Sequence, residues 1–233
     1  MRSRSQAGLL ELLGGFRLFW GGAEFSLPPQ AASLVAFLAI QERPVHRSVV
    51  AGTFWAGIPE HRALANLRSA LHRIPAPIVS AMNAHLHMRT DLRVDFREAS
   101  ELARDLVGSK VPPPEIGLIV NVLERDLLPA AEEGWLEPER QRYRRLRLRG
   151  LTAVGGLLLQ ARRSAEAVEV AQTAVSIEPL SDKAEHLLIS ALIADGNASL
   201  AAREYRDYRR RLWRELRVSP APELTSLLEP QAH

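Results

Sequence analysis

The chain has 233 residues and a formal net charge of +3, which is divided unevenly: residues 1–97 carry eleven arginines against six acids, and residues 98–233 carry nineteen basic against twenty-one acidic residues. The absence of cysteine excludes disulfides, thiolate metal sites and cysteine nucleophiles. No apolar run approaches the roughly 18 residues of a membrane span, and Met1–Gln6 leads into no signal core, so we expect a cytoplasmic protein without membrane contact. The basic first half favours nucleic acid as a partner, although a solvated arginine-rich surface is the simpler alternative.

Short strands, then helices, then strands are predicted along the first half. Residues 9–13, 16–20 and 23–27 are apolar segments split by paired glycines, which is typical of a small antiparallel sheet. Helices are expected over about 30–41, 47–55 and 60–74, because proline or glycine stands between apolar stretches of helical period. A strand pair over 78–80 and 84–88, connected at Met82-Asn83, would follow Pro75-Ala76-Pro77 as a wing.

The helix expected over residues 60–74 has two contrasting faces. Leu64, Leu67, Leu71 and Ile74 recur at helical spacing and should pack inward. The opposite face carries Arg62, Asn66, Ser69 and Arg73, flanked by Arg68 and His72. Arginine can bridge guanine and asparagine can bridge adenine in the major groove, so the pattern indicates a DNA-reading helix; a plain surface helix would show a similar pattern.

This order of elements over residues 9–96 resembles the OmpR-type winged helix, with the likeness carried by residues 12–18, 54–57 and 65–71. The resemblance implies base contacts from Arg62, Asn66, Ser69 and Arg73, with phosphate or wing contacts from Arg47, Ser48, Arg68, His72, His85 and Arg89. His85 and His87 alternate on the expected wing, but no third metal ligand is evident, so we expect no metal site.

The second half predicts helices only, over about 95–107, 115–123, 136–160, 163–176, 181–194, 198–216 and 221–228. A shift of 34 residues, the tetratricopeptide period, lays Ala167 on Ala201 but sets Arg162 against Gly196, so the repeat is degenerate. We expect the arginine run from residue 140 to 149 to be solvated or acid-paired. Tyr205, Tyr208 and Trp213 are expected in the core, and Trp135 in that of the helical half.

The helical half resembles the bacterial transcriptional activation domain of SARP-type regulators. The likeness rests on Trp135 with Glu139-Arg140, on residues 165–167, 179–180, 185–186 and 191–192, and on the ending from Glu215 to Leu224. Arg217 departs from the glycine usual there. The family implies promoter binding as a homodimer, often on direct repeats, and activation through RNA polymerase.

We therefore predict a mainly α chain: an N-terminal α+β winged helix-turn-helix over residues 1–97, then an all-α TPR-like helical-repeat domain over residues 98–233. The expected function is sequence-specific binding of double-stranded promoter DNA without a cofactor. Motifs for phosphate loops, zinc proteases and serine hydrolases are missing, which disfavours an enzyme. The alternative is a TPR-like protein-binding adaptor whose winged helix does not read DNA sequence.

Overall fold

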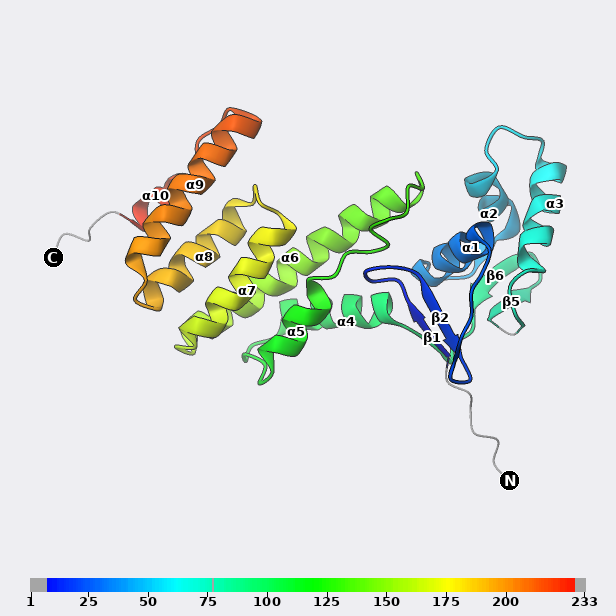
Figure 1. Ribbon diagram of the computed structural model, residues 1–233, viewed down its shortest axis with the longest axis horizontal. Coiled ribbons are helices and arrows are strands. Elements are labelled where there is room, and N and C mark those ends of the chain that lie inside the picture. The colour runs from blue at the N-terminus through cyan, green and yellow to red at the C-terminus, as the bar shows by residue number, and fades with distance from the viewer. Residues whose placement is uncertain (1–7, 77, 229–233) are drawn as a thin grey trace, which may run out of the picture. The chain divides into compact units, whose positions relative to one another are not determined.

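The computed structural model describes residues 8–76 and 78–228, so Met1–Gln6 and Pro77 lie outside the described residues. Two compact units divide the chain: Met1–Glu98 with Asp126–Gln141, and Ala99–Arg125 with Arg142–His233. The predicted fold class is confirmed, since helices predominate and the strands are confined to the first unit (Figure 1). In the part of the chain that the structure describes, no helix is long and apolar enough to cross a membrane.

Two small sheets frame the first unit. One has the order β3-β2-β1-β7, built from Ala23–Glu24, Arg17–Trp20, Gly8–Glu11 and Leu92–Val94, with β1 antiparallel to β2 but parallel to β7. The other has the order β4-β6-β5, built from Val45–His46, His85–Met88 and Val79–Met82. Strands β4 and β7 were not expected from the sequence. The wing hairpin was expected, and Asn83 adopts a φ of 54° at its turn.

Three helices follow the first strands: α1 (Pro29–Ile40), α2 (Arg47–Phe54) and α3 (Glu60–Leu71). Pro29 stands in the first turn of α1, where a backbone N–H is not needed, and α1 is buried from Leu34 to Ile40. Arg97 closes this helix by donating from Nε to the Ala39 carbonyl (2.8 Å) and from Nη2 to the Gln41 carbonyl (3.0 Å). Helix α1 is thus the core of the unit.

The segment Asp126–Gln141 packs within the first unit, although the sequence assigned it to the second domain. The Gly14 N–H donates to the Asp126 carbonyl (2.7 Å), and the Leu128 N–H donates to the Leu12 carbonyl (2.9 Å). Arg140 then donates to the carbonyls of Leu127, Leu128 and Ala131. We call residues 126–141 the return arm; its hydrogen bonds are to the backbone and leave little trace in a sequence pattern.

The second unit is all helical. It contains α5 (Ile116–Leu123), α7 (Ser164–Ile177), α8 (Asp182–Ala194), α9 (Ala198–Leu216) and α10 (Pro222–Ser226), with parts of α4 (Asp95–Gly108) and α6 (Leu136–Gln160). Within the arginine run, Arg147 is buried and donates from Nη1 to the carbonyls of Leu123 and Arg125, both at 2.9 Å. That arginine caps a helix, whereas Arg142, Arg145 and Arg149 are exposed, as expected for solvated side chains.

The 34-residue repeat is visible in the backbone of this unit. Arg162 and Gly196, one period apart, both adopt left-handed φ values, 60° and 82°. The following N–H groups bond back in the same way, Arg163 to the Leu158 carbonyl (2.9 Å) and Asn197 to the Leu192 carbonyl (2.8 Å). Ala167 and Ala201 are both fully buried. The sequence mismatch at Arg162 therefore hides a conserved turn geometry.

Candidate nucleic-acid interface

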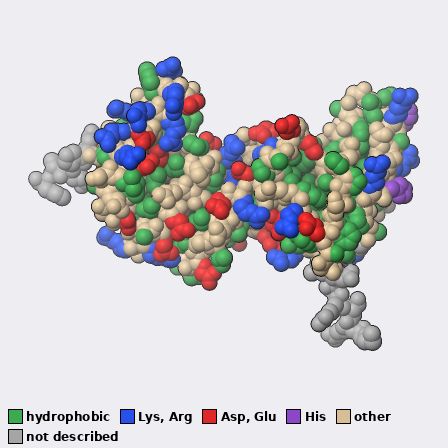
Figure 2. All heavy atoms as spheres, in the orientation of Figure 1, with side chains coloured by type: hydrophobic (Ala, Val, Ile, Leu, Met, Phe, Trp, Pro, Cys, Tyr) green, Lys and Arg blue, Asp and Glu red, His purple; other side chains and the backbone are tan. Residues whose placement is uncertain are grey.

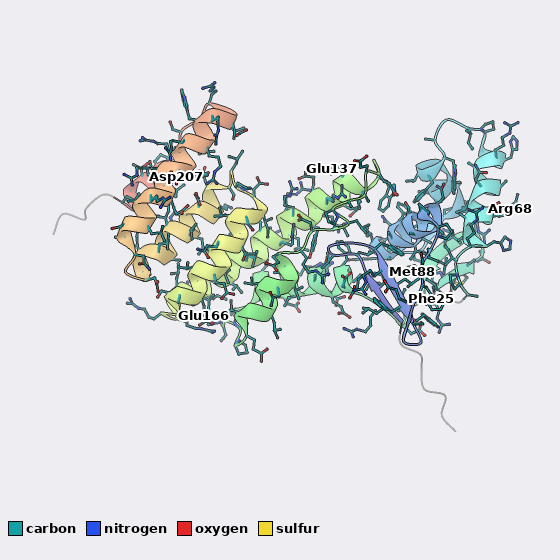
Figure 3. All side chains as sticks on the ribbon, viewed as in Figure 1. Phe25, Arg68, Met88, Glu137, Glu166 and Asp207 are labelled. Atoms are coloured by element: carbon teal, nitrogen blue, oxygen red, sulfur yellow. The ribbon has the colours of Figure 1, made fainter. Side chains whose placement is uncertain are left out.

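Helix α3 presents a polar, cationic face to solvent. Arg62, Asn66, Ser69 and Arg73 are all exposed, as are Arg68 and His72. Arg68 points away from the body of the unit (Figure 3), and basic and histidine side chains gather at the edge where α3 lies (Figure 2). The Ser69 hydroxyl donates to the Ala65 carbonyl (3.2 Å), so its oxygen remains able to accept. The exposed donors therefore match what a major groove requires.

The buried face of α3 differs in part from the prediction. Ala63, Leu67, Ala70 and Ile74 are buried, whereas Leu64 and Leu71 are only half-buried. The helix ends at Leu71, because the N–H groups of Arg73 and Ile74 bond to carbonyls three residues back (3.1 Å each) ahead of Pro75. Arg73 consequently lies in the turn after α3 and not on its helical face.

At the start of α2, His46 acts as the N-cap, a role the sequence analysis missed. The Ser48 N–H donates to His46 Nδ1 (3.3 Å), and the Ser48 hydroxyl lies 2.7 Å from the same nitrogen. Arg47 is half-buried and its backbone N–H donates to the Ala84 carbonyl (2.8 Å). The expected phosphate-binding helix start is therefore held by local hydrogen bonds before any ligand arrives. A short polar residue next to a predicted helix start was the available signal.

The wing carries a histidine contact and an ion pair. The His85 ring lies against the His46 ring with centroids 5.1 Å apart, and His85 is exposed. Arg89 donates twice to Asp91 (Nε to Oδ1, 2.7 Å; Nη2 to Oδ2, 2.5 Å), and this hydrogen bonding holds the pKa of Asp91 below its usual range. Arg89 must release Asp91 to bind a phosphate. Among the described residues, no three His, Asp or Glu side chains form a group that could hold a metal ion.

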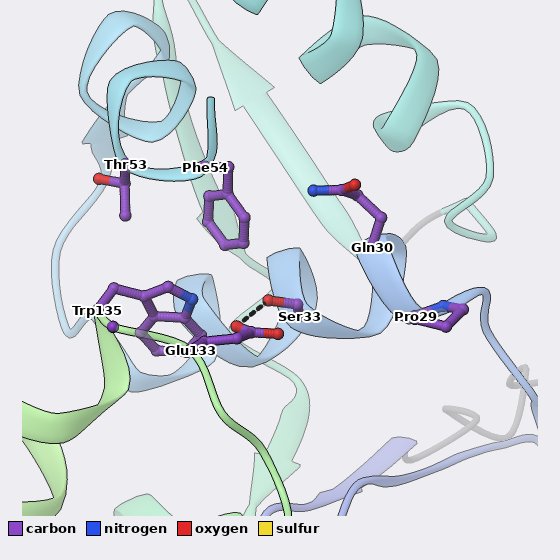
Figure 4. A pocket seen from close by; sticks show the side chains of 8 residues that line it. Pro29, Gln30, Ser33, Thr53, Phe54, Glu133 and Trp135 are labelled. Atoms are coloured by element: carbon purple, nitrogen blue, oxygen red, sulfur yellow. Dashed lines mark hydrogen bonds between the residues drawn. The ribbon is translucent and has the colours of Figure 1, made fainter. Parts of the chain in front are cut away.

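Trp135 corrects an expectation about the core. It does not pack in the helical unit: its ring meets Phe37 of α1 (5.2 Å between centroids) and Phe54 of α2 (6.0 Å) in the first unit. Beside it is a hollow of about 390 Å³ lined by residues of α1, α2 and the return arm, including Gln30 and Thr53. The Ser33 hydroxyl donates to Glu133 there (Figure 4). The tryptophan thus anchors the return arm on the two helices that support α3.

A winged helix with a polar third helix, followed by paired repeat helices, defines a transcription regulator of the SARP type. Residues 124–230 match the family described as the bacterial transcriptional activator domain. The chain is similar to the regulatory protein AfsR of Streptomyces griseus, at 26% identity over 222 residues, which are 89% of this chain and 23% of that protein. These findings confirm the predicted resemblance.

The fold has a counterpart among solved structures. Mycobacterium tuberculosis EmbR, solved in complex with a low affinity phosphopeptide, aligns with a TM-score of 0.73 at 17% identity, covering 97% of this chain and 65% of that chain. At this identity the likeness concerns the fold. The chain spans less than a quarter of the length of AfsR, 23%, and somewhat less than two thirds of the EmbR chain, 65%.

Proposed function

We propose that this SARP-type regulator binds promoter DNA in a sequence-specific way through α3 and activates transcription through its helical unit. The observation that carries the proposal is the solvent-exposed set of Arg62, Asn66 and Ser69 on one face of α3. Those side chains supply the donors and acceptors that read base edges. The proposed domains are the predicted ones, a DNA-binding domain over residues 1–97 and an activation domain over residues 98–233.

Around α3, the remaining predicted contacts divide by their availability. Arg68 and His72 are exposed, and Arg47 and Ser48 stand at the start of α2, where N–H groups favour anions. His85 lies exposed on the wing. We propose that these residues hold phosphates or the wing's groove. Arg89 is the weakest candidate, since Asp91 already neutralises it.

Activation would require contact with other proteins. We propose that the helical unit supports a homodimer on direct repeats and reaches RNA polymerase, because stacked helical hairpins leave surfaces suited to protein partners. The adaptor function stays an alternative, and the exposed Trp213 and arginines of α9 favour it.

The test is sequencing of fragmented host DNA captured by the purified chain at near-physiological salt, beside the double variant R62A/N66A. We expect enriched sites with a shared repeated motif, whose preference is relaxed in the double variant by about 1 to 3 kcal/mol per position. The control R145A, on the exposed face of α6, removes the same charge and should leave the enriched motif unchanged. Identical enrichment by wild type and R62A/N66A, or no enrichment from folded protein, would overturn the proposal.

A further inference from the structure

Helix α9 has a cationic face that the packing of the unit does not use. Ala201, Tyr208 and Leu212 are buried on one side of the helix. The opposite side carries arginines at spacings of three and four residues, all exposed, which we call the α9 arginine stripe: Arg203, Arg206, Arg210, Arg214 and Arg217. Basic side chains gather over this helix (Figure 2). Spacings of this kind place the five on one line.

The charge of the stripe is only partly neutralised. Asp207 pairs with Arg203 (3.9 Å) and with Arg210, and Glu215 pairs with Arg214 (3.5 Å). Helix α9 holds six arginines and three acids, a net of +3, and Arg217 follows as its C-cap. The side chains of Arg203, Arg210 and Arg214 remain 72%, 76% and 74% exposed. Such a surface attracts an anionic partner.

Trp213 lies beside the stripe and corrects the expectation of core packing. Tyr208 is buried as expected, and its hydroxyl donates to Asp182 Oδ1 (2.7 Å), but Trp213 is 55% exposed. Leu216 and Val218 next to it are 54% and 48% exposed. Hollows of about 450 and 420 Å³ along the helix are lined by its arginines and Asp207. Arginine and tryptophan are the residues most enriched at the energetic centres of protein interfaces.

We propose that this face of α9 binds an acidic protein segment: carboxylates of the segment pair with the α9 arginine stripe, and an apolar side chain packs on Trp213. Two features favour a protein over a nucleic-acid backbone. Asp207 stands in the middle of the stripe and would repel phosphates, and the apolar group of Trp213, Leu216 and Val218 offers a duplex backbone nothing. The inference rests on the proposed function in one respect, that the helical unit acts by contacting proteins.

The probe is a labelled helical peptide of about 16 residues, with glutamates along one side and leucines beside them, a length that matches the stripe at about 1.5 Å per residue. Its binding to the full chain is measured by fluorescence anisotropy. Two partner peptides replace the glutamates by glutamine or the leucines by serine. We expect the chain to bind the first peptide, and R206Q/R210Q/R214Q to lose about tenfold or more in affinity. W213A should lose the preference for leucine over serine.

The control R142A/R145A/R149A removes three exposed arginines of α6 and should bind the peptide as the wild type does. Equal losses in the two triple variants, or equal affinity of the wild type for all three peptides, would overturn the proposal. So would a random-sequence DNA duplex that displaces the peptide and loses affinity in the same α9 variant. Because the α9 variants should still enrich the same DNA sites, loss of site enrichment with intact peptide binding would contradict only the proposed DNA reading.

Discussion

At the scale of single residues, Glu185 of α8 stands out because a carboxyl group is buried without a hydrogen-bond partner. The residue is 1% exposed, and both its carboxyl oxygens are buried. Burial raises the pKa of Glu185 from 4.5 to about 7, while Arg211 opposes and Glu204 supports the rise. Tyr208 nearby stays protonated, because burial and its hydrogen bond to Asp182 raise its pKa. The helical unit therefore holds a neutral acid under mildly acidic conditions.

This burial predicts a pH-dependent stability. Between about pH 4.5 and 7 the folded chain binds more protons at Glu185 than the unfolded chain, so the free energy of unfolding falls as pH rises through this range. E185Q should remove that slope and stabilise the unit at pH 8 by about 1 to 3 kcal/mol. Urea unfolding at pH 5.5, 7 and 8 measures it, with the exposed E124Q as control. An unchanged slope in E185Q would assign the pH dependence elsewhere.

The paired left-handed turns give a second prediction for single residues. Gly196 has a φ of 82° and open space where a Cβ would stand, so G196A should cost about 1 to 2 kcal/mol through backbone conformation alone. R162G at the equivalent turn, where φ is 60°, should stabilise by about 0.5 kcal/mol, since relief of strain exceeds the entropy cost of glycine. Thermal unfolding of both variants checks the opposite signs. Shifts in the same direction would argue against equivalent turns.

At the scale of elements, the return arm ties its tryptophan to α1 and α2. W135A should destabilise the winged-helix unit by about 2 to 4 kcal/mol, because the ring fills the space against Phe37 and Phe54. Hydrogen exchange of the full chain should show faster exchange in α1 and α2, with α8 and α9 unchanged. The variant W213A, whose ring is 55% exposed, is the matched control and should leave exchange in α1 and α2 as it is. Faster exchange confined to α8 and α9 in W135A would contradict the placement.

The elements also separate what the sequence could predict from what it could not. Periodic helices such as α8 and α9 were found nearly to the residue, because their apolar spacing is local. Strands β4 and β7 have two and three residues and pair with distant strands, so no local pattern reveals them. The return arm depends on backbone carbonyls, which every residue has. Of the candidate site, the exposure of Arg62, Asn66 and Arg68 was predictable, but the His46 cap and the Arg89–Asp91 pair were not.

At the scale of the whole molecule, two units carry different cationic surfaces. The α3 surface combines arginine with asparagine and serine and has histidines around it, which suits base edges. The α9 surface combines arginine with tryptophan and acids, which suits a protein partner. The predicted boundary at residue 97 lies next to the compact-unit boundary at Glu98, but the return arm rejoins the first unit from beyond α5. A fragment ending at residue 97 would therefore lack Trp135, and a DNA-binding fragment has to extend through Gln141.

Salt dependence tests the whole molecule as a DNA reader. On an enriched site, the logarithm of the association constant should fall with the logarithm of salt concentration by about 0.9 per phosphate contact. R68A, and R47A at the start of α2, should each reduce that slope by about 1. R89A should change it little, because Asp91 already neutralises Arg89, whereas D91A frees that arginine and should steepen the slope. R145A serves as the control. A slope that is the same in R68A, R47A and the wild type would mean that neither arginine contacts a phosphate, and a steep slope lost in the α9 variant would place the DNA on the helical unit.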